Sequence, residues 1–156
     1  MITTLLFDFS RTILFPKDEA YKLGLNRLYG DEKGRHEFTF DSHFVFNEQL
    51  LSYIKTIKDM FGIYIFTSGS VQNDPESRRI LDPLFRGIYS AASIGISKAD
   101  PAAYTYVLED IGARASETVF IDDLARNIEA ARHAGLHTIL YEDYDAFQKQ
   151  LLAIIN

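Results

Sequence analysis

The sequence predicts an α/β fold in which a parallel β-sheet is covered by helices on both faces, giving three layers. Short β-branched and aromatic runs recur along the chain without alternating apolar and polar residues, which is typical of strands buried on both faces. Amphipathic segments lie between them, and strands that alternate with helices form parallel sheets. At 156 residues, of which 47% are apolar, the chain is expected to form a single domain, residues 1–156, with a substantial core.

Five runs are predicted to form the sheet. Their apolar residues are nearly continuous, so neither face is expected to meet solvent. In chain order the runs are TTLLFD (3–8), GIYIFT (62–67), GIYSA (87–91), TVFID (118–122) and HTILY (137–141).

The segment 47–62 is predicted to be a helix because its leucine and isoleucine residues recur at helical spacing. It ends at Gly62, and glycine suits the left-handed conformation that closes many helices. Residues 144–155 are predicted to form the last helix of the chain.

The segments 100–112 and 123–135 carry signals for both ends of a helix. Asp100 and Asp123 are expected to cap the first turn, and Pro101 fits the first helical position. Each segment ends with a glycine, which suits a left-handed C-cap. Together the helices and strands alternate along most of the chain.

Residues 15–46 interrupt this alternation. They hold Pro16, three glycines and the aromatic cluster EFTFDSHFVF, with one predicted helix near residues 18–29. The stretch is too long for an ordinary loop between a strand and a helix, which takes roughly two to six residues. We therefore expect a small insert, or cap, after the first strand. His36 and His43 within it are expected to be exposed loop residues.

Polar residues end several of the predicted strands. The carboxyl ends of parallel strands meet at one edge of the sheet, and ligands bind there, where the strand order reverses. A lysine just before the helix 100–112 would reach the same edge. Carboxylates, a lysine and a hydroxyl in one place suit a divalent cation and a phosphate. The candidate site residues are Asp8, Thr67, Ser68, Lys98, Asp122 and Asp123.

These residues resemble the four sequence motifs of the haloacid dehalogenase-like (HAD) superfamily, whose members are mostly phosphatases that form an aspartyl-phosphate. The resemblance spans most of the chain. It implies a Rossmann-like core, Mg²⁺ as the cofactor, a catalytic nucleophile in the first motif and a reduced cap in the insert. The motifs occur in order as Asp8 with Thr12, Thr67, Lys98 and FIDDLARN (120–127).

The chemistry of the acidic side chains agrees with this assignment. A carboxylate such as Asp8 can attack phosphorus and hold it as a mixed anhydride, which divides the hydrolysis into two steps. Mg²⁺ held by Asp8 and Asp123, with Asp122 adjacent, would offset the developing charge. The resemblance adds the backbone carbonyl of Ser10 as a metal ligand. Asn127 is expected to orient one of the aspartates.

The phosphate is expected to bind to residues at the other strand ends. Lys98 would pair with both the phosphate and Asp8, which lowers the pKa of Asp8 and keeps it ionised. The Thr67 hydroxyl and the backbone N–H groups of Ser68 and Gly69 would donate to phosphate oxygens. Gly69, without a side chain, would let that backbone approach closely.

Ser10 departs from the HAD phosphatase pattern. Those phosphatases usually have an aspartate there, which protonates the leaving oxygen and activates the water that clears the aspartyl-phosphate. A serine hydroxyl does not titrate near neutral pH, and loss of a general acid or base costs roughly 10²–10⁴ in rate. We therefore expect phosphate binding to survive while turnover is slow, or is restricted to substrates with good leaving groups.

Two other functions stay open. One is a non-catalytic module that binds a phosphorylated ligand or a protein. The other is a dehalogenase or a phosphonate hydrolase, because these members of the superfamily also lack the second aspartate. Dehalogenases do not need a second carboxylate pair such as Asp122 and Asp123. Phosphonate hydrolases need a Schiff-base lysine, and Lys17, Lys22 and Lys33 match no pattern for one.

The composition narrows the choice of partners. The formal charge of −6 argues against nucleic acids and anionic membranes, because both would repel the average surface. A small phosphorylated substrate fits better. The chain has no cysteine and lacks a basic leader or a membrane-length apolar run, so we expect a cytoplasmic protein. A site left open by a reduced cap would admit a bulky substrate or be closed by a second subunit of a homodimer.

Overall fold

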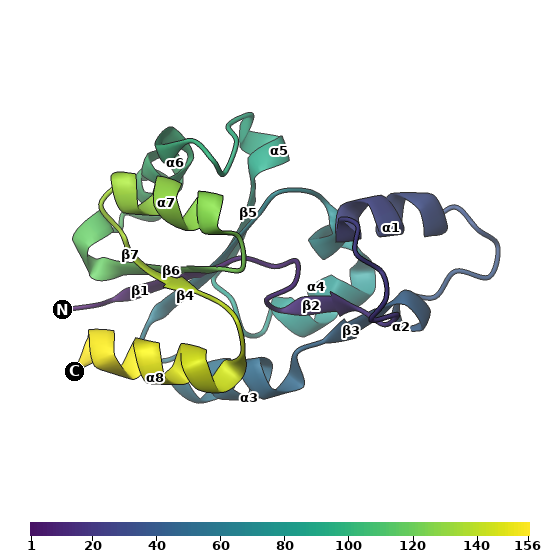
Figure 1. The fold of residues 1–156 in the computed structure, drawn as a ribbon, viewed down its shortest axis with the longest axis horizontal. Helices are drawn as coiled ribbons and strands as arrows, with labels where there is room; N and C mark the ends of the chain where they lie inside the picture. The colour runs from purple at the N-terminus through teal and green to yellow at the C-terminus, as the bar shows by residue number, and fades with distance from the viewer.

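The computed structural model describes residues 1–156 and confirms the predicted fold class. Five parallel strands form one central sheet with helices on both sides (Figure 1). Their spatial order is β5-β4-β1-β6-β7. Both ends of each strand lie within one residue of the ends predicted from the sequence. The bounds are β1 (Thr4–Phe7), β4 (Gly62–Thr67), β5 (Gly87–Ser90), β6 (Thr118–Asp122) and β7 (His137–Leu140).

β1 is the central strand and fixes the position of the candidate site. β4 pairs with it on one side and β6 on the other, and all of its side chains are buried, because packed residues cover both faces of the sheet. Its last residue, Phe7, is level with Ile65 of β4 and Ile121 of β6. Because these strands are parallel, the loops after β1, β4 and β6 all lie at the same edge of the sheet. The strand order also reverses at β1. Ligands of open parallel sheets bind at such an edge.

The longer helices form the two outer layers (Figure 1). On one face, α6 and α7 pack in a cluster of 12 buried residues. On the other, α3 and α8 belong to a cluster of 24, which also takes in buried residues of the insert. The larger cluster of buried residues therefore lies on the face of the sheet covered by α3 and α8. The bounds are α3 (Glu48–Ile57), α6 (Pro101–Ile111), α7 (Ala125–His133) and α8 (Tyr144–Ile155).

The predicted end of the helix at 47–62 is wrong. α3 stops at Ile57, and Gly62 begins β4, where it pairs with Thr4. Phe61 continued the apolar spacing because it packs into the same core from the turn after the helix. The end predicted for the helix 100–112 is confirmed, since Gly112 is left-handed with φ of 68°.

One helix longer than four residues was not predicted. α4 (Pro75–Leu81) begins with Asp74 as its N-cap and a proline at its first position. The Asp74 side chain accepts from the Glu76 N–H at 2.9 Å. No helix of the structure has the length and apolar content needed to cross a bilayer. The remaining short helical turns are η1 (Val71–Asn73), α5 (Ala91–Ile94) and η2 (Ala115–Glu117).

The insert forms a small lobe beside the carboxyl edge of the sheet (Figure 1). Its two short strands pair antiparallel. The helix predicted near 18–29 starts later, because the Asp18 carboxylate accepts from the Ala20 N–H at 2.9 Å and so makes a turn there instead. The elements are β2 (Leu14–Pro16), α1 (Leu25–Glu32), α2 (Phe40–His43) and β3 (Phe44–Phe46).

Candidate functional site

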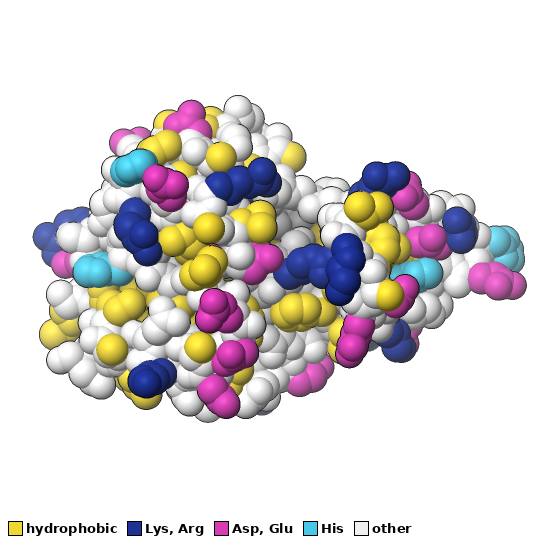
Figure 2. Space-filling view, in the orientation of Figure 1, with side chains coloured by type: hydrophobic (Ala, Val, Ile, Leu, Met, Phe, Trp, Pro, Cys, Tyr) yellow, Lys and Arg dark blue, Asp and Glu magenta, His cyan; other side chains and the backbone are white.

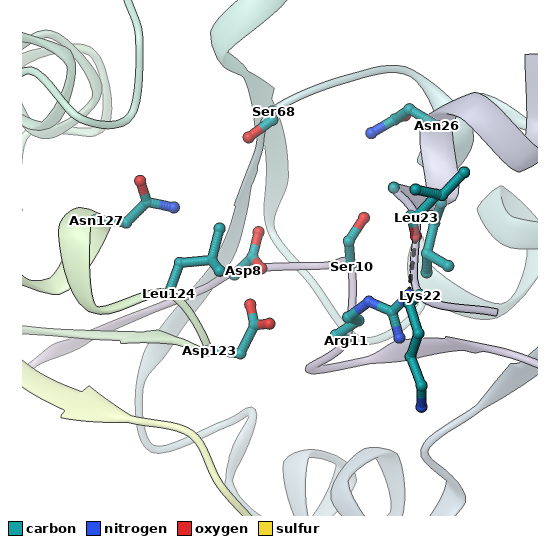
Figure 3. A pocket seen from close by; sticks show the side chains of 12 residues that line it. Asp8, Ser10, Arg11, Lys22, Leu23, Asn26, Ser68, Asp123, Leu124 and Asn127 are labelled. Atoms are coloured by element: carbon teal, nitrogen blue, oxygen red, sulfur yellow. Dashed lines mark hydrogen bonds between the residues drawn. The ribbon is translucent and has the colours of Figure 1, made fainter. Parts of the chain in front are cut away.

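The loops after β1, β4 and β6 surround a cavity of about 260 Å³ that the insert closes on one side. Asp8, Ser10 and Asp123 lie together in its middle (Figure 3). Ser68 also lines the cavity, whereas Thr67 and Lys98 lie buried behind it. The structure thus brings the candidate residues to one edge of the sheet.

Lys98 is a buried cation between two carboxylates. Its Nζ donates to Asp8 Oδ1 at 2.6 Å and to Asp122 Oδ2 at 2.7 Å. It also lies over the rings of Phe66 and Phe120, with Nζ 5.5 Å and 5.3 Å from their centroids. Burial alone lowers the pKa of Lys98, but the two carboxylates outweigh it and raise that pKa above its ordinary value. Lys98 is therefore held charged beside Asp8.

Both carboxylate oxygens of Asp122 accept hydrogen bonds from neighbouring residues. Besides Lys98, it accepts from Asn127 Nδ2 at 3.1 Å, as predicted for an asparagine that orients an aspartate. Its other oxygen accepts from the Leu124 N–H at 2.8 Å. The prediction that Asp123 caps α7 is wrong, because Leu124 is at the N-cap position and makes no side-chain cap. The Asp123 side chain is turned to the cavity instead (Figure 3).

The three aspartates form an acidic cluster in which one oxygen of each lies within 4.8 Å of the others. Burial raises the pKa of Asp8 to about 6, against the opposing charge of Lys98. Burial and the charge of Asp8 raise the pKa of Asp123 to about 7. Asp123 makes no ion pair, so the cluster holds more negative charge than Lys98 neutralises. Closely spaced carboxylate oxygens of this kind fit Mg²⁺, which prefers oxygen ligands.

Hydrogen-bond donors at the end of β4 have no acceptor within the chain. The Thr67 hydroxyl is buried without a hydrogen-bond partner. The backbone N–H groups of Ser68 and Gly69 likewise make no hydrogen bond within the chain. The buried Ser10 hydroxyl, across the cavity, also lacks a partner. Buried polar groups are nearly always paired, so the two buried hydroxyls indicate a missing partner. Together with the free N–H groups of the more exposed Ser68 and Gly69, they fit an anionic ligand such as phosphate.

Sequence reasoning missed Asn26, which joins the insert to the loop after β4. Its Oδ1 accepts from the N–H groups of Ser70 at 2.8 Å and Val71 at 3.0 Å. A Cβ on Gly69 would lie 2.2 Å from Asn26 Cγ, so only glycine leaves room for this contact. Gly69 thus makes room for Asn26, and the close approach of a phosphate to its backbone stays a prediction. No sequence signal marks it, because the partners are far apart in the chain.

Arg11 was also missed, and it fixes the rim of the cavity. It has a left-handed backbone with φ of 61°, uncommon outside glycine. Its guanidinium donates to the carbonyls of Tyr21 at 3.0 Å and Leu23 at 2.8 Å; the Leu23 contact is drawn in Figure 3. Arg11 therefore ties the start of the insert to the loop that carries the nucleophile candidate.

Most of the other residues considered from the sequence lie outside the cavity. His36 is exposed as predicted, but the prediction for His43 is wrong, because it is half-buried in the short helix α2; neither lines the cavity. Among the three lysines of the insert, only Lys22 does. Its Nζ donates to the carbonyl of Glu19 at 2.8 Å.

The model of the haloacid dehalogenase-like hydrolase family matches residues 5–135. This chain therefore belongs to that family of hydrolases. It is 34% identical over 119 residues to enolase-phosphatase E1 of Bradyrhizobium sp., covering 72% of this chain and 50% of that protein. It is 42% identical over 53 residues to the sesquiterpene phosphatase astK of Aspergillus oryzae, covering 34% of this chain and 27% of that protein. The chain spans half or less of these curated relatives.

Solved structures show the same fold. The HAD family enzyme bt-2542 of Bacteroides thetaiotaomicron, crystallised with magnesium and inorganic phosphate, has a TM-score of 0.69 at 18% identity, covering 94% of this chain and 99% of that chain. A HAD-superfamily hydrolase of Geobacter sulfurreducens has a TM-score of 0.70 at 15% identity, covering 97% of this chain and 96% of that chain. These likenesses extend over the insert as well as the sheet.

Proposed function

We propose that this hydrolase is a Mg²⁺-dependent phosphatase that acts through an aspartyl-phosphate on Asp8, and that Ser10 makes it slow or specialised. One observation carries the proposal. A buried carboxylate, paired with Lys98, lies between the acidic Asp123 and the unpaired donors at the end of β4. This arrangement supports a role for Asp8 as the nucleophile, between residues suited to a cation and residues suited to a phosphate. A small phosphorylated molecule is the proposed substrate.

The reaction proceeds by two displacements at phosphorus. An oxygen of the Asp8 carboxylate attacks, the bond from phosphorus to the ester oxygen breaks, and the leaving group departs as an oxyanion that takes a proton from solvent. Water then attacks the same phosphorus and gives a proton to solvent, the bond to Asp8 breaks, and phosphate is released with the Asp8 carboxylate restored. The Lys98 ammonium, 2.6 Å from Asp8, favours the ionised carboxylate that the first step needs.

Mg²⁺ would be held by Asp8 and Asp123, together with the backbone carbonyl of Ser10. When bound, it supplies positive charge that lessens the repulsion between the carboxylates and the phosphate. Asp122 is the less suitable ligand, because Lys98, Asn127 and the Leu124 N–H already occupy its oxygens. We infer that it positions Lys98 and the start of α7.

The phosphate oxygens would be held by the Thr67 hydroxyl and the N–H groups of Ser68 and Gly69. Asn26 fixes this loop from the insert by its bonds to Ser70 and Val71. Donors that are fixed before the substrate arrives need no reorganisation as charge develops on the phosphoryl group. The insert, residues 15–46, is in this proposal a reduced cap that shapes the site.

Ser10 leaves the site without the usual acid and base. No other carboxylic acid except Asp8 and Asp123 lines the cavity, and neither is free to serve. The alcohol then leaves without a proton, which favours substrates whose leaving groups are stable anions. The names of two relatives, an enolase-phosphatase and a sesquiterpene phosphatase, support phosphate-ester hydrolysis. A location in the cytoplasm and a homodimer stay predictions.

The proposal is tested by comparing an aryl phosphate with an alkyl phosphate in the presence of Mg²⁺. We expect the aryl ester to be hydrolysed much faster, because its leaving group needs no acid, and Asp8→Asn to remove both activities. Activity retained in Asp8→Asn would contradict it. Ser10 also favours a second function, that of a phosphate-ligand binding module. Tight phosphate binding with no turnover of either ester would support that module instead.

A further inference from the structure

Two leucines stand exposed on either side of the candidate active site. Leu23 is 51% and Leu124 is 42% exposed, and both line the cavity. In Figure 3 they lie on opposite sides of Asp8 and Ser10. Figure 2 shows hydrophobic side chains on both sides of the hollow between the sheet and the insert, with charged side chains between them. An apolar rim around a polar centre is common in ligand sites.

Both leucines are fixed in place by residues of the site. The Leu23 carbonyl accepts from the Arg11 guanidinium at 2.8 Å. The Leu124 N–H donates to Asp122 Oδ1 at 2.8 Å. Their exposure therefore does not come from loosely held loops. The same contacts that build the acidic centre hold an apolar side chain at its edge.

Three of the polar side chains along this rim already have partners. Arg11 donates to two carbonyls of the insert, Lys22 to the carbonyl of Glu19, and Asn127 to Asp122. A leaving group rich in hydroxyls would find few free partners here and would lose hydration. An apolar group would gain by covering the leucines. We therefore expect the rim to favour an apolar leaving group over one rich in hydroxyls.

We propose that the preferred substrates are phosphate monoesters whose organic part is apolar and lies between Leu23 and Leu124. This inference rests on the proposed phosphatase function. The cavity of about 260 Å³ takes the phosphoryl end, and the organic part extends over the open rim. Leu23 comes from the insert and Leu124 from the turn before α7, so both lobes contribute to specificity.

The test uses 4-alkylphenyl phosphates with methyl, propyl and hexyl chains. Their leaving groups have nearly the same acidity, so a change in kcat/KM along the series reports contact with the chain. Complete burial gives about a fourfold gain per methylene. For a half-open rim, half of that free energy gives about twofold per methylene, so we expect roughly thirtyfold over the five methylenes from methyl to hexyl. A flat series would overturn the inference while leaving the phosphatase function in place.

Matched variants locate the contact. Leu23→Ser and Leu124→Ser should each flatten the series, with the hexyl ester losing more than the methyl ester. Leu152→Ser, at a leucine that is 43% exposed on α8 and does not line the cavity, should leave it unchanged. If Leu152→Ser flattens the series as much as the other two, the rim is not responsible.

A binding measurement separates this inference from the proposed function. Alkylphosphonates of one, four and eight carbons are titrated calorimetrically in the presence of Mg²⁺. We expect the dissociation constant to fall with chain length in the native protein and much less in Leu23→Ser. This holds even if no ester is turned over, which would contradict the phosphatase alone. Equal affinity for all three phosphonates would contradict the apolar rim.

Discussion

Replacing Lys98 by methionine removes the buried positive charge with little change in side-chain volume. In the native protein its Nζ lies 2.6 Å from Asp8 and 2.7 Å from Asp122, with all three residues at most 5% exposed. Lys98→Met therefore leaves two buried carboxylates without a counter-charge. Removing one partner of a buried ion pair costs about 3–5 kcal/mol of the free energy of unfolding. For a chain of this size the melting temperature should fall by about 10 °C or more.

The loss should depend on pH. Without Lys98, the pKa of Asp8 in the folded protein rises further above its unfolded value, because the opposing charge that lowers it is gone. A carboxyl whose folded pKa is raised costs stability as pH rises through that pKa, since the unfolded state ionises more readily. The penalty of Lys98→Met should thus be largest near pH 8. Near pH 5, protonation of Asp8 should remove a large part of this penalty.

The assay is urea unfolding of the native protein and Lys98→Met at about pH 5 and pH 8, both without metal. Lys55→Met, at an exposed lysine of α3, is the matched control and should change stability by less than about 0.5 kcal/mol at either pH. An equal loss at both pH values for Lys98→Met would refute the reasoning. It would mean that the side chain acts by packing against Phe66 and Phe120 rather than by its charge.

Three further predictions concern the metal, the insert and the serine. Asp123→Asn should raise the metal-free free energy of unfolding at pH 8 by about 1–2 kcal/mol, because the native pKa of about 7 marks a carboxylate that costs stability above that pH; calorimetry should also show that Mg²⁺ no longer raises its melting temperature. Asn26→Ala and Asn26→Asp should both weaken inorganic phosphate binding, by loss of the loop contact in the first and by added negative charge in the second, and an unchanged dissociation constant in both would remove Asn26 from the site. Ser10→Asp should speed alkyl phosphate hydrolysis by a large part of roughly 10²–10⁴, and speed an aryl phosphate less; equal gains would place the effect on the second step.

Much of the fold could be predicted because the buried strands have a strong local signal. Continuous apolar runs placed all five strands of the sheet within one residue at each end. Helix ends were less certain. Phe61 extended the apolar period past the end of α3, since a buried turn residue cannot be told from a helical one by spacing alone. α4 was missed although Asp74 and Pro75 carry the signals that were used for the helix beginning at Pro101.

The candidate site residues could be predicted as a set, because parallel strands bring their carboxyl ends together. Their individual roles could not. Asp122 and Asp123 are adjacent in sequence, and only the structure shows one fully engaged and the other turned to the cavity. Asn26 and Arg11 were missed because each acts through contacts with backbone groups distant in the chain. Such contacts leave no motif in a single sequence.

In the proposed mechanism Asp8 forms a covalent acyl phosphate, the aspartyl-phosphate intermediate. Ser10 should slow its clearance, so the intermediate should accumulate during turnover of an aryl phosphate with Mg²⁺. Acid quenching within the first turnovers, followed by peptide mass spectrometry, measures it directly. We predict the added mass of one phosphoryl group on the peptide that contains Asp8, absent from Asp8→Asn. Steady turnover with no adduct on that peptide, or an adduct on another residue, would contradict the account.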